Sequence, residues 1–400
     1  MRFALVTTHP PGTGSLNEYA FHFVRALRRK PEVSEVVLLL DELPEGAPYP
    51  PDEPAADGLA ALRYVPAWRF GAWDNALRVR RAVRSVEPDA VLFNLQFATF
   101  AGGKAPAALG LIAPALVKRA GYPTLILLHN IMQTVDLESA GFAGNPVMAA
   151  LIRAFGDLAT RLLLQADIVA LTIPKYVEIL RDRFGEAATG NVYLIPHGAF
   201  DIPPPPTHDL PDGPLQIMTF GKFGTYKRVE DLITALNILR QGDRPPLELV
   251  IAGSDSPNAA GYLDGVAQAN ADLPGLRFTG YVAEEDVPRI FGESAVVVFP
   301  YTSTTGSSGV LHQAGEHGRA AVMPDIGDLA ALVREEGYAA EFFEPGDAKS
   351  MADAIARVID DPARRIELGE RNYRAAVGLS LEDVVDWYLI HLRELPGAPA

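Results

Sequence analysis

Apolar residues recur along the chain in short, nearly continuous runs, separated by longer stretches in which they are spaced by three or four positions. The runs are rich in Val, Leu, Ile and Phe, which is typical of parallel strands buried on both faces. The stretches between them have the spacing of amphipathic helices. In the first half the runs are residues 2–8, 35–41, 90–95, 124–130, 167–173 and 192–198, and the helical stretches are residues 17–29, 74–86, 105–119 and 146–165. This alternation predicts a doubly wound α/β domain.

A proline-rich segment interrupts the alternation near the middle of the chain. Its prolines can continue neither a helix nor a central strand, so residues 203–214 are predicted to form a stiff linker. Beyond it the apolar runs resume at residues 215–221, 247–253, 276–281, 295–301, 320–325 and 339–345. We therefore expect two α/β domains, residues 1–202 and 215–380. The amphipathic segment at residues 381–395 follows the last predicted strand and can close either domain.

The composition fits two domains and excludes several classes of protein. A length of 400 residues is long for one core, because domains commonly hold about 100 to 200 residues. No apolar run approaches the roughly 20 residues of a membrane-spanning helix. The first residues are too short an apolar stretch for a signal peptide and are expected to form a buried strand, which favours a cytoplasmic protein. The absence of cysteine excludes disulfides, thiolate nucleophiles and thiolate-bound metals.

The net charge and one apolar stretch indicate which partners the protein can bind. A formal charge of −15 disfavours general nucleic-acid binding, which depends on Lys and Arg to neutralise phosphates. An apolar stretch at residues 97–121, bracketed by Lys and Arg, fits either a core helix or peripheral contact with a membrane or a lipid-linked molecule. We expect the core helix, with a place at the inner face of the membrane as the alternative.

Two segments of the second half indicate an anion site. Lys222 follows the first predicted strand and Lys227 precedes the next helix, so both ammonium groups belong to the carboxyl edge of a parallel sheet, where open α/β folds bind ligands. Ser307 and Ser308 lie in a loop of small residues that runs into a helix, and backbone N–H groups there can approach an anion. The alternative is that the lysines are solvated surface charges and the serines only cap the helix.

The order and spacing of these segments resemble those of the retaining glycosyltransferases of family 4. The segments that carry the resemblance are residues 220–236, 248–257, 277–301, 301–325 and 344–362, and the first half of the chain matches more weakly. The resemblance implies the GT-B fold, in which two Rossmann-like parallel-sheet domains face each other across a cleft. The C-terminal domain of that fold holds the nucleotide sugar and the N-terminal one the acceptor. It also implies that the helix at residues 381–395 packs back on the first domain.

The resemblance implies roles for individual residues of the second half. Lys222 stands where the family usually has an Arg, and it and Lys227 are expected to hold the donor diphosphate; a lysine keeps the charge but loses the planar fork of a guanidinium. The family's loop carries two glutamates separated by seven residues, and here those places hold Thr305 and Gln313. Gln313 can still contact a ribose, whereas Thr305 is too short to hold sugar hydroxyls as a glutamate does. The implied donor-binding set in this loop is Thr305, Gly306, Ser307, Ser308, Gly309 and Gln313.

The first half offers a glycine-rich loop and a histidine. Gly14 and Ser15 follow the first predicted strand, at the place of the family's loop over the donor phosphates, and a dehydrogenase is excluded because the dinucleotide fingerprint is incomplete. His129 ends a central strand, where the family has a histidine that contacts the donor sugar; a structural histidine is the alternative. His312 and His317 are five residues apart and do not share a helical face, so we expect no metal site.

Together these features predict a metal-independent retaining glycosyltransferase of the hexosyltransferase type. It is expected to move a sugar from a nucleoside-diphosphate sugar to a hydroxyl of a sugar, lipid-linked or small-molecule acceptor, in polysaccharide or glycoconjugate biosynthesis. His129, Lys222 and Lys227 are its expected catalytic residues. The alternative is a non-catalytic relative that binds a nucleotide or a sugar, which the exchanged positions Thr305 and Gln313 favour. No cofactor is expected beyond the nucleotide-sugar substrate.

Overall fold

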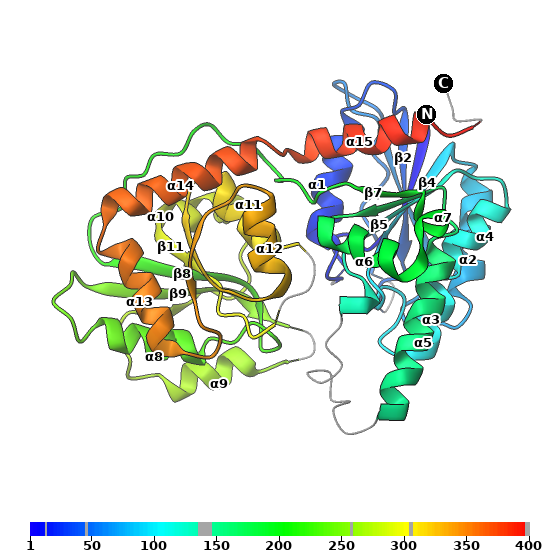
Figure 1. The fold of residues 1–400 in the computed structure, drawn as a ribbon. Helices are drawn as coiled ribbons and strands as arrows, with labels where there is room; N and C mark the ends of the chain where they lie inside the picture. The colour runs from blue at the N-terminus through cyan, green and yellow to red at the C-terminus, as the bar shows by residue number, and fades with distance from the viewer. Residues whose placement is uncertain (13, 45–46, 135–145, 257–258, 304–306, 397–400) are drawn as a thin grey trace. The chain divides into compact units, whose positions relative to one another are not determined.

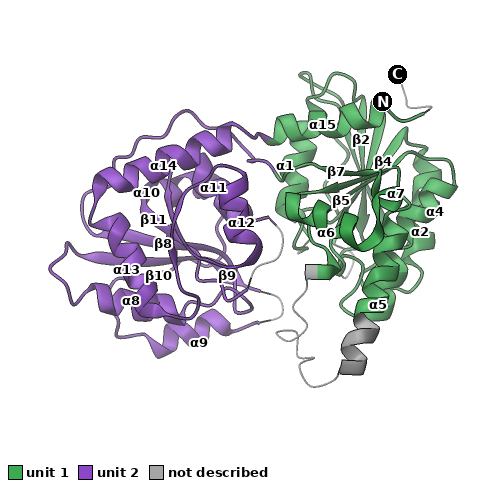
Figure 2. Ribbon diagram, in the orientation of Figure 1, with its two compact units in different colours: residues 1–197, 381–400 green, residues 198–380 purple. Residues whose placement is uncertain are grey.

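The computed structural model describes residues 1–12, 14–44, 47–134, 146–256, 259–303 and 307–396. Two compact units account for the chain: unit 1 comprises residues 1–197 and 381–400, and unit 2 comprises residues 198–380 (Figure 2). Each unit is an α/β structure with its own parallel sheet. The predicted class, two Rossmann-like parallel-sheet domains, is confirmed.

Within the described residues, unit 1 forms a seven-stranded parallel sheet in the order β3-β2-β1-β4-β5-β6-β7 (Figure 1). Its strands are β1 Arg2–Val6, β2 Glu35–Asp41, β3 Ala61–Trp68, β4 Ala90–Leu95, β5 Thr124–Leu128, β6 Ile168–Leu171 and β7 Val192–Leu194. Its helices are α1 Asn17–Arg28, α2 Asn75–Val86, α3 Lys104–Gly110, α4 Ala113–Arg119, α5 Pro146–Leu163, α6 Pro174–Phe184, α7 Glu186–Thr189 and α15 Leu381–Arg393. The central strands β1, β4 and β5 are buried almost throughout, as expected for strands covered by helices on both faces.

The sequence prediction missed an edge strand of unit 1 and a break within one of its helices. The edge strand β3 was not predicted, because Arg63 and Tyr64 interrupt its apolar run and it includes Pro66, which is tolerated at the edge of a sheet. The single helix predicted at residues 105–119 is two helices, α3 and α4. They are separated at Leu111 and Ile112, and α4 restarts with Pro114 in its first turn, where a missing N–H costs nothing.

Helix α15 packs on α1 within unit 1 (Figure 1). The Tyr388 ring of α15 lies 5.6 Å from the Phe23 ring of α1, edge to face. Around this apolar contact Lys30 Nζ lies 2.7 Å from a carboxylate oxygen of Asp386, and Arg29 pairs with Glu382. The buried rings supply most of the attachment, since exposed ion pairs contribute little.

Unit 2 forms a six-stranded parallel sheet within its described residues, in the order β10-β9-β8-β11-β12-β13. The strands are β8 Leu215–Phe223, β9 Leu247–Asp255, β10 Leu276–Phe278, β11 Ser294–Val298, β12 Ala320–Pro324 and β13 Ala340–Phe343. The helices are α8 Glu230–Leu239, α9 Tyr262–Ala269, α10 Val287–Glu293, α11 Gly309–Glu316, α12 Gly327–Glu335, α13 Ala348–Ile359 and α14 Pro362–Val377.

Alternate residues of the central strands β8 and β11 enter two different cores. Ile217 and Val296 belong to a cluster with α8, α9 and α13, whereas Met218 and Val297 belong to a cluster with α10, α11 and α12. The period of two in a strand produces this division, because successive side chains point to opposite faces. Helices α8 and α11 therefore cover opposite faces of the sheet.

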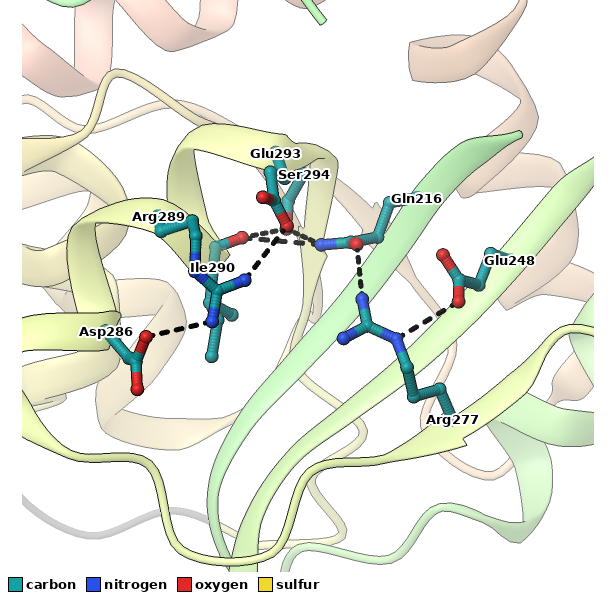
Figure 3. Close-up of polar contacts among 8 residues, drawn as sticks. All are labelled: Gln216, Glu248, Arg277, Asp286, Arg289, Ile290, Glu293 and Ser294. Carbon is teal, nitrogen blue, oxygen red and sulfur yellow. Dashed lines mark hydrogen bonds and ion pairs between the residues drawn. The ribbon is translucent and has the colours of Figure 1, made fainter. Parts of the chain in front are cut away.

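A polar network holds together the amino ends of four strands of unit 2 (Figure 3). Arg277 of β10 donates to Glu248 of β9 at 3.1 Å and to the Oε1 atom of Gln216 of β8 at 2.9 Å. The Nε2 atom of Gln216 in turn donates to the hydroxyl of Ser294 of β11 at 2.8 Å. The network therefore lies at the edge opposite to the carboxyl ends of the strands, where the loops after β8 and β11 are found.

The proline-rich segment expected as a linker at residues 203–214 clusters with unit 2. Arg319, which is 5% exposed, donates through its guanidinium to the carbonyl of Thr207 at 2.7 Å. The hydroxyl of Tyr373 donates to the carbonyl of Pro203 at 2.8 Å. These bonds satisfy part of a backbone that has few N–H groups of its own. Among the described helices of the whole chain, none combines the length and apolar character that crossing a bilayer requires.

Candidate functional site

The topological switch point of unit 2 lies between β8 and β11. These strands are neighbours, yet the helices that follow them, α8 and α11, cover opposite faces of the sheet, and ligands of open α/β folds bind at such points. The loop after β8 and the loop after β11 meet there, through an antiparallel bridge between Lys227 and Tyr301. The N–H of Thr302 also donates to the carbonyl of Tyr226 at 2.8 Å.

Lys227 is a buried cation at this switch point. It is 8% exposed, and its Nζ atom lies 4.9 Å from the centre of the Tyr301 ring and 5.9 Å from that of Tyr226. Its hydrogen bond to the carbonyl of Phe220 is long, at 3.5 Å. Among the described residues no carboxylate lies within ion-pair distance of it. Aromatic faces compensate part of the cost of burying an ammonium, and an anionic ligand would supply the rest.

Gly221 makes room for the ammonium of Lys227. It has φ +129°, a conformation that other residues rarely adopt, and a Cβ atom at this position would lie 2.5 Å from the Nζ of Lys227. A larger residue would therefore strain the backbone and displace the ammonium. Lys222 is exposed and lies inside β8, in register with Ser254 of β9, rather than in the loop that follows. The two predicted phosphate ligands thus differ, because one is buried and the other is exposed.

The loop that precedes α11 is described only in part. Thr305 and Gly306, both predicted to contact the donor, lie outside the described residues. Ser308 is the N-cap of α11 and makes no side-chain capping hydrogen bond within the described structure. Gly309 begins the helix, whose first N–H groups have no intrahelical acceptor and so form a place for an anion. Gln313, predicted to contact the ribose, is 2% exposed on α11.

Ser307 is held by a buried histidine. Its hydroxyl lies 3.0 Å from Nε2 of His312, a residue of α11 that is wholly buried. The other ring nitrogen, Nδ1, lies 2.8 Å from the hydroxyl of Tyr338, between α12 and β13. Glu336 approaches the same Nε2 atom at 3.9 Å, and burial, together with the charge of Glu335, raises the pKa of Glu336 to about 8. Sequence analysis considered His312 only as a metal ligand, since nothing local links it to Ser307 or Tyr338.

In unit 1, His129 follows β5 at the carboxyl edge of the sheet. Its Nε2 atom lies 2.6 Å from Oδ1 of Asn94 on β4, and Nδ2 of Asn94 donates to the hydroxyl of Thr7 at 3.0 Å. Because the amide oxygen can only accept, the proton of His129 is on Nε2, and Nδ1 is a hydrogen-bond acceptor. Burial, and to a lesser extent the nearby His197, lowers the pKa of His129 to about 3. His129 is therefore neutral at physiological pH.

The glycine-rich loop after β1 lies at the switch point of unit 1. Strand β1 adjoins β4 there, and the hydroxyl of Ser15 donates to Oε1 of Gln96, just after β4, at 3.1 Å. Gly14 packs against Thr8 so closely that a Cβ atom would overlap its side chain. The structure therefore brings Ser15 to the residues that follow β4, and it gives a steric reason for glycine at position 14.

Tyr19 is a residue of this edge that sequence analysis missed. It is 5% exposed on α1, and its ring lies 5.0 Å from that of His129 and 4.5 Å from that of His197, edge to face in both cases. In the sequence, its spacing of four residues from Phe23 is that of an ordinary core position on one face of a helix. The ring thus limits the orientations open to both histidines.

Two surface hollows lie at the opposite, amino edge of unit 2. Their volumes are about 440 and 530 Å³, and both include Arg244. Arg244 is already paired with Asp360, with its Nε atom 2.7 Å from a carboxylate oxygen. Lys227, the buried cation at the switch point, belongs instead to the carboxyl edge. Among the described residues, no three His, Asp or Glu side chains are grouped as metal ligands are.

Residues 214–361 match the family model described as "Glycosyl transferases group 1", which spans both switch-point loops of unit 2. The chain resembles the group 1 glycosyltransferases. The match covers the segments on which the sequence resemblance rested, and that resemblance is confirmed. A comparison with curated protein sequences found no match.

Solved structures of glycosyltransferases share the fold of the whole chain. Sucrose-phosphate synthase from Thermosynechococcus elongatus is 18% identical, with a TM-score of 0.74 over 98% of each chain. HepE from Anabaena in complex with UDP-glucose is 15% identical, with a TM-score of 0.67 over 99% of this chain and 100% of its own. The trehalose-6-phosphate synthase OtsA is 13% identical, with a TM-score of 0.69 and the same coverage. At these identities the likeness establishes the fold, which is GT-B.

Proposed function

We propose that this protein is a glycosyltransferase that moves a sugar from a nucleoside-diphosphate sugar to an acceptor hydroxyl. The observation that carries the proposal is Lys227, a buried ammonium at the switch point of unit 2 with no carboxylate partner among the described residues. A diphosphate fits this position, because it supplies the missing negative charge. The match of the same unit to the group 1 glycosyltransferases supports that ligand over other anions.

The chemistry proposed for the site is stabilisation of a departing diphosphate. As the bond between the sugar and the β-phosphate breaks, negative charge grows on the phosphate oxygens. Lys227, Lys222 and the first N–H groups of α11 stabilise that charge without reorganising. In the retaining mechanism of the resembled family, the acceptor attacks from the face that the diphosphate leaves, and a phosphate oxygen takes the acceptor's proton. Cationic side chains then serve in place of a divalent metal.

His129 is proposed to contact the transferred sugar. Its neutral ring offers Nδ1 as an acceptor for a sugar hydroxyl, while Nε2 is held by Asn94. The low pKa of His129 suits this role, because an imidazolium would repel the positive charge that develops on the sugar in the transition state. Gly14 and Ser15, at the same edge of unit 1, are proposed to approach the donor through their backbone.

Uridine diphosphate sugars are the first donors to test. HepE from Anabaena has been solved in complex with UDP-glucose, and the E. coli trehalose-6-phosphate protein bound to UDP-2-fluoro glucose. A mutant of S. aureus TarM has been solved in complex with fondaparinux, α-GlcNAc-glycerol and UDP. For this chain we propose a sugar, lipid-linked or small-molecule acceptor. Polysaccharide or glycoconjugate biosynthesis, in the cytoplasm or at the inner face of the membrane, is the corresponding setting.

Calorimetric titration tests the donor site. The protein is titrated with UDP, GDP and ADP, each in EDTA, and at least one is expected to saturate a single site. Lys227→Ala is expected to weaken that binding about 10- to 100-fold through loss of a charge-assisted contact. Lys349→Ala is the matched control, because Lys349 is an exposed lysine of α13 that pairs with Asp353. Absence of binding by all three nucleotides, or equal effects of the two variants, would contradict the proposal.

A feature of the sequence supports the alternative, a non-catalytic protein that binds a nucleotide or a sugar. Thr305 and Gln313 replace the two acids of the resembled family, and Gln313 is buried. A protein of this kind would bind a nucleoside diphosphate and release none from a nucleotide sugar. Assaying nucleotide release from UDP-, GDP- and ADP-sugars, with a panel of acceptors, separates the two functions.

A further inference from the structure

The contacts of Tyr338 determine the direction of a buried hydrogen-bond chain in unit 2. Tyr338 is 1% exposed, and burial raises its pKa well above the ordinary value, so its hydroxyl keeps its proton. Within the described residues, the acceptor facing that hydroxyl is Nδ1 of His312, at 2.8 Å. A buried phenol without an acceptor is costly, so Tyr338 donates to Nδ1.

The proton of His312 then follows from the chemistry of the ring. A neutral imidazole carries one N–H, and Nδ1 is occupied as an acceptor, so the N–H is at Nε2. That N–H points to the hydroxyl oxygen of Ser307, 3.0 Å away. Ser307 therefore accepts from His312, and its own proton is directed to a different partner.

A protonated Glu336 is compatible with a neutral His312 ring. Its carboxylate oxygens are buried and have no hydrogen-bond partner among the described residues, and the nearer one lies 3.9 Å from Nε2 of His312. An ionised Glu336 would favour the imidazolium of His312, in which Nδ1 carries a proton and cannot accept from Tyr338. The raised pKa of Glu336, about 8, keeps the carboxyl protonated at neutral pH.

We propose that Ser307 is a hydroxyl donor to a phosphate oxygen of the nucleoside diphosphate, and that Tyr338 and His312 are positioning residues that aim its proton. The inference rests on the proposed function, since it assigns a donor within that site. Ser307 is half-buried in the loop after β11, the loop that carries Tyr301 beside the ammonium of Lys227. Successive hydrogen bonds polarise one another, so the chain from Tyr338 strengthens the donor at its end.

A double-mutant cycle tests the inference, with UDP, GDP or ADP as the probe, whichever binds the wild-type protein. Ser307→Ala is expected to weaken binding about 10- to 100-fold, and Ser307→Thr, which keeps a hydroxyl, to restore most of it. Tyr338→Phe is expected to weaken binding about three- to tenfold when Ser307 is present. In the Ser307→Ala background the same change is expected to have no effect, because the donor it aims is gone.

A control variant separates positioning from general destabilisation. Tyr373→Phe removes a hydroxyl hydrogen bond of 2.8 Å within the same unit, made to the carbonyl of Pro203, and is expected to leave nucleotide binding unchanged. Equal weakening by Tyr338→Phe in both backgrounds, or unchanged binding in Ser307→Ala, would overturn this inference and leave the proposed function standing. If the wild-type protein binds none of the three nucleotides, both are overturned.

Discussion

The ammonium of Lys227 lies 4.9 Å from the centre of the Tyr301 ring, and the two residues pair through their backbones across the switch point of unit 2. A charge in such a position is retained at a cost in stability, because no carboxylate among the described residues neutralises it. Proteins accept costs of this kind where a ligand later supplies the opposite charge.

Removal of the charge at Lys227 is expected to weaken nucleotide binding without lowering the free energy of unfolding. Lys227→Met keeps the length of the side chain and removes the buried charge, so the free energy of unfolding without ligand is expected to stay equal or rise by about 1 to 2 kcal/mol. Nucleotide binding is expected to weaken about 10- to 100-fold, as in Lys227→Ala. Denaturant unfolding and calorimetry measure the two effects, with Lys349→Met as the control for an exposed lysine. A marked loss of stability in Lys227→Met would show that the charge serves the fold.

Substitution of Gly221 tests the space that the ammonium occupies. Gly221→Ala adds a methyl group 2.5 Å from the Nζ of Lys227 at a residue with φ +129°. We expect a loss of about 1 to 3 kcal/mol in unfolding free energy together with weaker nucleotide binding. Gly346→Ala is the control, since Gly346 has φ +76° and nothing within 4 Å of its Cβ position. The control is expected to show backbone strain alone, and a loss of binding there as well would contradict the interpretation.

The pKa of His129 is expected to depend on Asn94, whose amide oxygen contacts Nε2 of the ring. NMR titration of the wild-type ring is expected to show no protonation above about pH 4, because burial and His197 lower the pKa to about 3. Asn94→Asp places a carboxylate against Nε2 and is expected to raise the pKa of His129 by about 2 units or more. Asn270→Asp, at the residue that follows α9 in unit 2, is expected to leave it unchanged. A wild-type pKa near 6.5 would contradict the geometry.

Protonation of His129 also links pH to stability. Since its pKa is lowered in the folded state, the unfolded chain binds more protons between about pH 3 and pH 6.5. The unfolding free energy contributed by this residue is therefore fully present above pH 6.5 and falls as the pH is lowered towards 3. Unit 1 is expected to lose stability over that acid range, and His129→Gln to reduce the loss.

Glu336 gives the opposite pH dependence in unit 2. Its pKa is raised from 4.5 to about 8 in the folded protein, so the folded state binds the extra proton between those values. Stability contributed by the neutral carboxyl is present below pH 4.5 and is lost as the pH rises to about 8. Glu336→Gln is therefore expected to stabilise unit 2 more at pH 8.5 than at pH 5, by a difference on the order of a few kcal/mol. Thermal unfolding at the two pH values measures it, and equal shifts would contradict the burial of the charge.

Much of the fold could be predicted because its determinants are local. The composition of the apolar runs at β1, β4 and β5 predicts buried parallel strands. The spacing of apolar residues between the runs predicts the helices. Strand β3 could not be found in this way, because an edge strand with a proline carries no continuous apolar run. The break between α3 and α4 was missed because apolar spacing continues through it.

The site could be predicted only in its outline. The order of strands and loops indicated that Lys222 and Lys227 belong to the carboxyl edge of the second sheet, but sequence spacing could not say that one is exposed and the other buried between two tyrosines. The hydrogen bonds from Ser307 to His312 and from His312 to Tyr338 could not be predicted from the sequence, because they join residues of separate elements. Such contacts depend on packing of the whole unit.

Time-resolved NMR of a nucleotide-sugar reaction tests whether this protein is a retaining glycosyltransferase. The protein, in EDTA, is incubated with α-linked UDP-, GDP- and ADP-sugars and a panel of acceptors, and the anomeric signal of the first product is followed. We expect one donor to release its nucleoside diphosphate and give an α-linked product, and Lys227→Met to abolish the reaction. Nucleotide binding without any turnover would identify the non-catalytic relative, and a β-linked product would contradict the retaining mechanism.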